Sequence, residues 1–312
     1  MHLRVISPAE TTEQVLSYLV AEPAVANLVV HRGAAVDPAG DVVIADVARE
    51  SANEVLRELK AMGLDKSGSI ALDAVGVALS SRGSEAEKAA PGAGDDAVVW
   101  EEIEQRTGEE SRLSVTFLLF LSIATVIAGI GVLLDQPILI VGAMVVGPEF
   151  GPLAALSVGV IRRRPRVIGR SLLALAVGFA VAITVTVLST LALNAGGLVT
   201  REMLLGARPL TDFIWRPDAL SWVIAFLAGI AGIVSLTAAK SGALIGVLIS
   251  VTTVPAAGNV AVAIAYGVPD EAWGSALQLG INLGAIATAG ILTLAVQRWL
   301  SRRRRQTAAI RS

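Results

Sequence analysis

The sequence contains no cysteine and only two histidines, His2 and His31, among its 312 residues. Disulfide bonds and thiolate metal sites are therefore excluded. An HExxH zinc motif needs two histidines on one helix face, and a Ser/His couple needs a histidine beside its serine. Neither motif is found, and the apolar segments contain no pair of aspartates. We therefore expect that the protein is not an enzyme and uses no cofactor.

Charged residues are also scarce, because they make up 17% of the chain against about 25% in an average soluble domain. Hydrophobic residues reach 54%. The shortage is uneven: residues 1–112 have an ordinary soluble composition, whereas residues 113–298 consist mainly of long apolar runs. The sequence predicts a soluble domain followed by an α-helical membrane domain. The net charge of −2 gives no indication of nucleic-acid binding.

Residues 1–80 predict the order strand-helix-strand twice, which is the plan of a ferredoxin-like α+β domain. Two matches to the capping box start the predicted helices, Ser7 with Glu10 and Ser51 with Glu54. A capping box satisfies two backbone donors that would otherwise lack acceptors at a helix start. The fold alone does not reveal a ligand.

One short segment of this domain is a candidate for a regulatory ligand site. The residues His31, Arg32 and Gly33 could bind an anion, and the alternative is that they form a solvated strand end. Residues 81–112 predict a flexible linker followed by an amphipathic helix. The glutamates of that helix are expected to face solvent rather than to hold a metal.

Six apolar segments are each long enough, at about 20 residues, to cross the hydrocarbon core of a bilayer. They are residues 113–134, 136–160, 169–193, 219–239, 241–267 and 273–297, followed by a basic tail over 299–312. Basic residues cluster at Arg162–Arg166, Lys240 and Arg302–Arg305, all on one side of such a six-span chain. The positive-inside rule then predicts a multi-pass protein of the cell membrane with both termini in the cytoplasm. The three arginines of the outer loop 194–218 are a contrary signal.

Spans one to three resemble spans four to six. In each half an Ala-Gly-Ile span precedes a glycine-rich span that proline interrupts near its centre. Because each half has three spans, the second half must be inverted, as in many secondary transporters. Carbonyls freed at such breaks are tolerated where they line a cavity. The candidate midplane site for a solute or ion consists of Gly147, Pro148, Glu149, Gly151 and Pro152 in the first half, and Thr252, Thr253, Pro255 and Asn259 in the second.

Glu149 is the one charged residue near the centre of a predicted span. A charge near the bilayer centre costs at least about 2.5 kcal/mol on insertion scales. The carboxyl group should therefore face the protein interior, and near Pro255 and Asn259 it could bind a proton, a cation or a polar solute. The structural alternative is a kinked helix packed against its repeat partner, with a neutral Glu149 bonded to a neighbouring carbonyl.

The segments VWEEIEQRTGEESRLS and GAMVVGPEFGPLAAL, in a chain with a small domain before six spans, resemble the DUF389 proteins. These are bacterial and archaeal hydrophobic proteins of unknown function. The resemblance covers essentially the whole chain, and it implies the architecture but not the activity. Members of the family commonly carry an apolar residue where this chain has Glu149, so a role for this carboxylate is not implied by the resemblance.

Two functions from different classes are consistent with these patterns. The first is a transporter or channel for a small solute or ion, regulated by a ligand bound to the ferredoxin-like domain. The alternative is a membrane-anchored sensor of a small ligand, such as a nucleotide, without transport activity. Small residues in the spans and the open edges of a four-stranded sheet predict a homo-oligomer, a trimer before a dimer. The other expected partner is the lipid bilayer.

Overall fold

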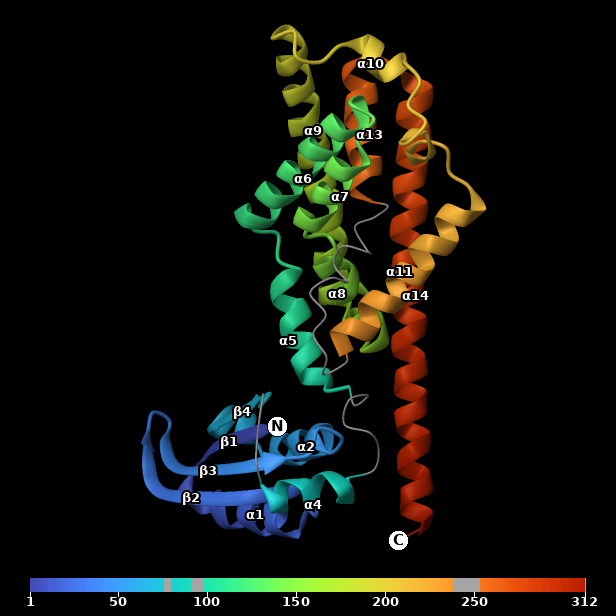
Figure 1. Ribbon diagram of the computed structural model, residues 1–312. Helices are drawn as coiled ribbons and strands as arrows, with labels where there is room; N and C mark the ends of the chain where they lie inside the picture. The colour runs from blue at the N-terminus through green and yellow to red at the C-terminus, as the bar shows by residue number, and fades with distance from the viewer. Residues whose placement is uncertain (76–79, 91–97, 238–252, 312) are drawn as a thin grey trace. The chain divides into compact units, whose positions relative to one another are not determined.

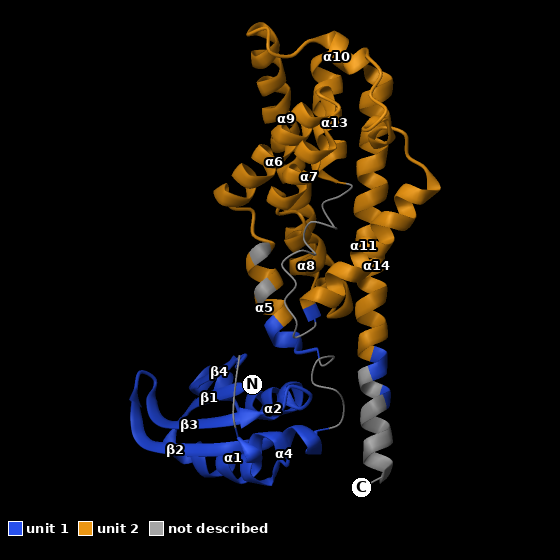
Figure 2. Cartoon of the chain, in the orientation of Figure 1, with its two compact units in different colours: residues 1–102, 237–239, 299–312 blue, residues 103–236, 240–298 orange. Residues whose placement is uncertain are grey.

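The computed structural model describes residues 1–75, 80–90, 98–237 and 253–311. Contacts divide the chain into two units, shown in blue and orange in Figure 2. Unit 1 comprises residues 1–102, 237–239 and 299–312, and unit 2 comprises residues 103–236 and 240–298.

Unit 1 contains a small antiparallel sheet with helices (Figure 1). Its strand order is β2-β3-β1-β4, with every neighbouring pair antiparallel. The first strand therefore lies inside the sheet, between β3 and β4. The elements are β1 (His2–Ser7), α1 (Ala9–Ala21), β2 (Val25–Val36), β3 (Ala39–Val47), α2 (Ala52–Ala61), α3 (Leu64–Ser67), β4 (Ser69–Asp73) and α4 (Ser81–Ala89).

The core of unit 1 follows from the two periodicities of its sequence. Alternate residues of β1 and β3 point to one face of the sheet, and residues three or four apart on α1 and α2 pack against that face. Together they form one hydrophobic cluster: Leu3, Val5, Val15, Leu19, Val43, Val47, Val55, Leu59 and Leu64.

Three local predictions for unit 1 are wrong. Ser7 is the last residue of β1, paired with Asp41 of β3, so Pro8 rather than Ser7 precedes the first helical residue. Ser51 does precede α2, but its backbone is already helical (φ −92°, ψ −7°), whereas a capping serine is normally extended. The segment expected to begin a flexible linker forms α4, because Ser80 caps it by accepting a hydrogen bond from the Gly83 amide at 3.1 Å.

Unit 2 is helical, and among the described residues four helices are long and apolar enough to cross a membrane. A bent pair, with 53° between its two helices, makes a fifth candidate span. The protein is therefore a multi-pass membrane protein by helix length and composition. The helices are α5 (Trp100–Glu110), α6 (Val115–Leu133), the bent pair α7 (Pro137–Val146) and α8 (Phe150–Ile161), α9 (Pro165–Ala195), α10 (Arg201–Leu205), η2 (Asp212–Ile214), α11 (Ala219–Thr237), α13 (Val254–Ala265) and α14 (Pro269–Arg311).

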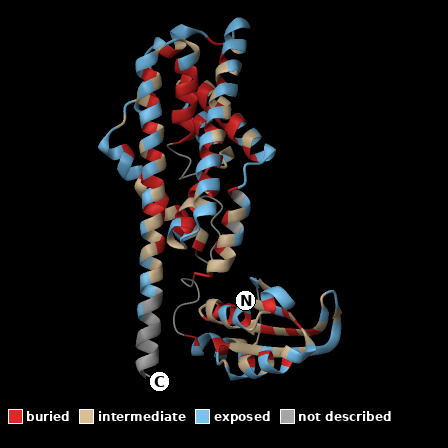
Figure 3. Cartoon of the chain, turned by 180° about the vertical axis from the view of Figure 1, so that it is seen from behind, coloured by how far each residue is buried: buried red, intermediate tan, exposed pale blue. Residues whose placement is uncertain are grey.

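The centre of unit 2 is α13, in which the residues from Val254 to Ala263 are all buried (Figure 3). A helix buried on all sides belongs in a core. It packs against α6 and α9, and it approaches α6 most closely where Gly258 meets Gly129, because a Cβ on Gly258 would lie 2.8 Å from the Gly129 nitrogen. The predicted span 241–267 thus contains only α13 within the described part of the chain, since residues 241–252 and the predicted inner charge Lys240 lie outside it.

At each end of unit 2, segments that are distant in the sequence are in contact. At one end, Asp135 after α6 accepts a hydrogen bond from Thr211 (2.9 Å), and Arg208 of the same segment pairs with Glu271 in the first turn of α14. At the other end, Arg162 after α8 donates to Glu104 of α5 (2.5 Å). The three loops predicted to lie outside the cell are therefore at one end of the unit.

Candidate functional site

The residues that start α8 and α13 are in direct contact. The Thr253 hydroxyl donates a hydrogen bond to Oε1 of Glu149, with 2.6 Å between the oxygens. Glu149 is 1% exposed and Thr253 is 0% exposed. Glu149 occupies the N-cap position of α8, and Thr253 occupies that of α13. Two helix N-termini of unit 2 therefore meet at one buried carboxyl group.

This arrangement has an electrostatic consequence. The N-terminus of a helix carries a partial positive charge of about half a unit, together with backbone amides that the helix itself does not use. Both α8 and α13 are 12 residues long, so each contributes a full helix dipole. The partial positive charges of both N-termini therefore lie beside the buried side chain of Glu149.

The prolines of the candidate site begin helices rather than interrupt them. Gly147 ends α7 in an extended conformation (φ −65°, ψ 124°), and Pro148 follows it in the break. Pro152 lies in the first turn of α8, and Pro255 lies in the first turn of α13. Proline is tolerated in a first turn because its missing amide would have no acceptor in the helix there. The sequence therefore encodes two short helices with fixed starting points.

The predicted site residues fall into two groups. Gly151 and Pro152 are buried beside Glu149 in α8, and Pro255 is buried beside Thr253 in α13. Thr252 lies outside the described residues. Asn259 is buried as well. It lies six residues after Thr253, or about 9 Å along the helix, and its side chain bonds residues other than Glu149.

Asn259 belongs to a second polar cluster that the sequence analysis missed. Its Nδ2 donates to Glu271 Oε1 at 3.0 Å and to Ser275 Oγ at 2.7 Å. The same carboxylate oxygen accepts a hydrogen bond from Arg208 Nη2 at 2.5 Å, and both charged side chains are more than 90% buried. The sequence placed Glu271 and Arg208 in outer loops, because the predicted sixth span began at residue 273, whereas α14 begins at Pro269.

A pocket of about 610 Å³ lies next to this second cluster, entirely within unit 2. It is formed by the segment between α9 and α11 and by the start of α14. Close approach of these segments depends on Gly274, whose Cβ would fall 2.3 Å from the carbonyl oxygen of Trp215. The charged residues that line the pocket are Arg208, Asp212, Arg216, Asp270 and Glu271.

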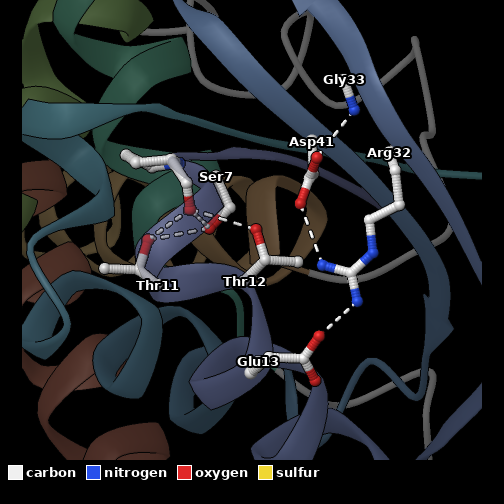
Figure 4. Close-up of polar contacts among 8 residues, drawn as sticks. Ser7, Thr11, Thr12, Glu13, Arg32, Gly33 and Asp41 are labelled. Atoms are coloured by element: carbon white, nitrogen blue, oxygen red, sulfur yellow. Dashed lines mark hydrogen bonds and ion pairs between the residues drawn. The ribbon is translucent and has the colours of Figure 1, made fainter.

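The candidate anion site in unit 1 is occupied by the chain's own carboxylate (Figure 4). Asp41 accepts a hydrogen bond from the Gly33 amide at 2.7 Å and another from Arg32 Nη1 at 3.0 Å. Arg32 also pairs with Glu13 of α1. The bond from Gly33, with those from Thr12 and Arg32, lowers the pKa of Asp41, and the bond to Asp41 raises the pKa of Arg32. An external anion would have to displace Asp41, while His31 stays exposed.

Among the described residues, no group of three or more histidine, aspartate or glutamate side chains is arranged to hold a metal ion. Glu149 and Glu271 each lie in a separate polar cluster of unit 2.

Comparison with known proteins supports the resemblance seen in the sequence. Residues 144–288 match the family described as "Domain of unknown function (DUF389)". An uncharacterised protein of Methanocaldococcus jannaschii is 26% identical over 207 residues, which is 65% of this chain and 62% of that protein. The match thus spans about three fifths of the length of this curated relative. No solved structure matches the chain. The matched region contains the residues of both polar clusters of unit 2, whereas α6 and most of α7 lie outside it.

Proposed function

We propose that this chain, which carries the DUF389 domain over residues 144–288, transports a small solute or ion across the membrane. The observation that carries the proposal is the contact between Glu149 and Thr253 at the starts of α8 and α13. Ionisable residues buried in membrane helices generally mark transport or proton pathways, because their burial is costly. Transporters often bind their substrate where interrupted helices present their N-termini to a common point.

An inverted repeat of two three-span halves is part of this proposal. Two features support it: α8 and α13 have the same length of 12 residues, and each has a proline in its first turn. The contact between Glu149 and Thr253 is expected if the two halves are related by an axis between these helix starts. The proposal includes six spans, and residues 241–252 of the expected fifth span lie outside the described residues.

The chemistry of the site favours protons or small cations as cargo or coupling ions. Glu149 supplies a carboxylate, and Thr253 supplies a hydroxyl oxygen 2.6 Å away. Oxygen ligands of this kind suit hard cations, and a carboxyl group can also carry a proton. Both helix N-termini place their partial positive charge beside this carboxyl group.

Regulation by the N-terminal domain, taken as ferredoxin-like, is also proposed. One covalent route is α5, which begins in unit 1 and continues into unit 2. Within unit 1, its Glu101 pairs with Lys60 of α2. Within unit 2, its Glu104 pairs with Arg162, the residue after α8. A ligand that shifts α5 would therefore act on the helix that begins at Glu149.

A flux assay with the purified full chain in proteoliposomes tests the proposal. An internal pH dye reports proton movement under an imposed potential, and the same vesicles are tested with sodium and potassium gradients. We expect flux of at least one of these ions, lost in Glu149→Gln and retained in Gly142→Ala, since a Cβ at Gly142 meets no described atom within 4 Å. Sealed vesicles with folded protein and no flux of any tested ion would refute ion transport.

The sensor alternative is favoured by one observation in unit 1. A pocket of about 510 Å³ lies between α1, β2 and α4, with Asn27, Arg82 and Glu85 among its lining residues. This size fits a small ligand. A thermal-shift screen of the full chain against nucleotides and other metabolites tests it. A strong shift by one compound, removed in Arg82→Ala, together with vesicles that pass no ion, would favour the sensor over the transporter.

A further inference from the structure

One face of α14 carries a stripe of buried polar side chains, which we call the polar stripe: Glu271, Ser275, Gln278 and Asn282. Their spacing of four, three and four residues places them on a single helix face. They are 5%, 0%, 4% and 0% exposed, respectively. The residues between them on the outer side, such as Ala276 and Leu277, are exposed. The helix therefore presents apolar residues outward and polar residues to the interior of unit 2, the reverse of a soluble helix.

Part of this buried polarity is not satisfied by the protein. Among the described residues, Oε1 of Gln278 and Oδ1 of Asn259 accept no hydrogen bond, and Nε and Nη1 of Arg208 donate none. Buried polar atoms normally have partners, either in the protein or in ordered water. Asn259 and Gln278 also lie next to other polar side chains. Asn259 donates a hydrogen bond to Ser275, and Gln278 Nε2 lies 3.4 Å from Asn282 Oδ1. The two amide oxygens can accept hydrogen bonds from water or bind a small cation, and the two guanidinium N–H groups can donate to water.

The polar stripe runs from the pocket towards Glu149. Helices α13 and α14 form an antiparallel hairpin through Gly267, which takes a positive φ of 66°. The bond between Asn259 and Ser275 fixes their register. Six residues further into the unit on each helix are Thr253 and Ile281, so Asn282 lies at about the depth of Thr253. From Glu271 to Asn282 the stripe covers about 16 Å at 1.5 Å per residue.

The pocket end of the stripe is closed by an ion pair. Arg208 and Glu271 both line the pocket, and each side chain is more than 90% buried by its surroundings. Their contact lies between the pocket and Ser275, because Asn259 bonds both Glu271 and Ser275. Breaking the contact would join the pocket to the stripe.

We propose that the polar stripe of α14 lines a hydrated pathway by which a proton or small cation passes between the pocket and Glu149, with the Arg208–Glu271 pair as its gate. The pathway rests on the proposed transport function but is itself a statement about water access. Its oxygen atoms from carboxylate, hydroxyl and amide groups suit cations rather than anions. The competing explanation is that the stripe only holds helices together by hydrogen bonds, as polar residues in membrane helices also do.

Single cysteines distinguish these explanations, because the natural chain contains none. Ser275→Cys and Gln278→Cys are placed on the stripe, and Ala276→Cys and Leu277→Cys at nearly the same depth on the outer face. The full-length variants in proteoliposomes are treated with a small cationic methanethiosulfonate, which reacts with the thiolate form of cysteine in water. We expect reaction at 275 and 278, which the reagent reaches whenever the Arg208–Glu271 contact opens, to be at least about tenfold faster than at 276 and 277, because thiolates form in water and not in hydrocarbon.

The gate is tested in the same assay by adding Glu271→Gln to Gln278→Cys. Loss of the charge should weaken the contact with Arg208 and raise the rate of modification at 278. An unchanged rate would overturn the gate, and equal protection of 275, 278, 276 and 277 would overturn the pathway.

Two results separate this inference from the proposed function. Fast modification of the stripe without ion flux would keep the pathway and refute transport. Flux with a protected stripe would keep transport and refute the pathway. Should the cysteine variants fail to fold, radiolytic hydroxyl labelling of the natural protein replaces them: oxidation of Leu279, beside Gln278, supports the pathway, and its protection to the level of the buried Leu294 overturns it.

Discussion

The Thr253 hydroxyl lies 2.6 Å from Oε1 of Glu149, although 104 residues separate the two in the sequence. The contact joins the N-cap residues of α8 and α13. If the contact serves transport, the hydroxyl and the carboxylate should be separable in their effects. Thr253→Val removes the hydrogen bond and keeps the shape, whereas Thr253→Ser keeps the hydroxyl.

We expect Thr253→Val to lower the stability of the full chain in detergent by about 1–3 kcal/mol, since it leaves a buried acceptor without this donor. Thr253→Ser should stay within about 1 kcal/mol of the natural protein because the donor remains. Glu149→Gln should leave folding and assembly intact while it removes ion flux. Melting temperature and flux are measured on the same preparations. Full flux in Glu149→Gln would show that the carboxyl group is structural.

The buried pair of Arg208 and Glu271 should show strong coupling. Removal of one partner from a buried ion pair costs about 3–5 kcal/mol, because the other charge stays buried alone. We therefore expect Arg208→Met and Glu271→Gln each to lower the melting temperature markedly, and the double variant to be less destabilised than the sum of the two. The exposed Arg216, paired with Asp212, is the matched control. Its replacement by Gln should change stability by less than about 1 kcal/mol.

Additive losses in the double variant would contradict a direct interaction between Arg208 and Glu271. In that case the hydrogen bonds of Asn259 to Glu271 and Ser275 would have to hold the cluster by themselves.

The crossing of α6 and α13 should not tolerate a side chain at Gly258. A Cβ there would lie 2.8 Å from the backbone nitrogen of Gly129, and backbone atoms cannot move aside as a flexible side chain can. We expect Gly258→Ala to destabilise unit 2 by about 1–3 kcal/mol through overpacking. Gly142→Ala is the control, because its Cβ would meet no described atom within 4 Å. Thermal unfolding that is equal for both variants would disprove the close crossing.

The hairpin of β2 and β3 should lose stability in acid through Asp41. Hydrogen bonds from the Gly33 amide, Thr12 and Arg32 lower the pKa of Asp41 below its ordinary value of 3.8. A carboxyl group with a lowered folded-state pKa adds stability above its unfolded pKa, and this stability disappears as the pH falls through the folded pKa. Hydrogen exchange of the β2 and β3 amides should therefore accelerate below about pH 4.

Asp41→Asn is the control for this acid effect. The variant should show faster exchange in the hairpin already at neutral pH, and it should respond less to acid than the natural chain. An identical acid response in both proteins would assign the effect to other carboxyl groups.

The proposed orientation predicts opposite labelling of two positions in cells. Thr200 belongs to the segment before α10, at the end with Arg208, and the proposed orientation places it outside. Ser84 in α4 belongs to the N-terminal domain, which is proposed to be cytoplasmic. In this cysteine-free chain, Thr200→Cys should react with an impermeant thiol reagent in intact cells, and Ser84→Cys only after permeabilisation. The reverse pattern would invert the proposed topology.

Local patterns in the sequence determined much of this structure. The alternation of apolar residues predicted the strands of unit 1 and their order with the helices, since burial on one face requires a fixed period. Glycine and proline around Glu149 predicted the break between α7 and α8, because they end and start helices wherever the chain places them. Apolar length predicted membrane helices. Each of these properties depends on residues close together in the chain.

Tertiary packing decided the rest. Ser7 fits a capping motif locally, but its pairing with Asp41 placed it in a strand. Hydropathy predicts that Glu271 lies in a loop, yet in the structure it is buried inside unit 2, where Arg208 and Asn259 donate hydrogen bonds to it. No local pattern reveals that Thr253 would meet Glu149, because this contact depends on how α13 packs against the other helices. A sequence predicts which groups must be buried, whereas only the packed structure determines which groups satisfy them.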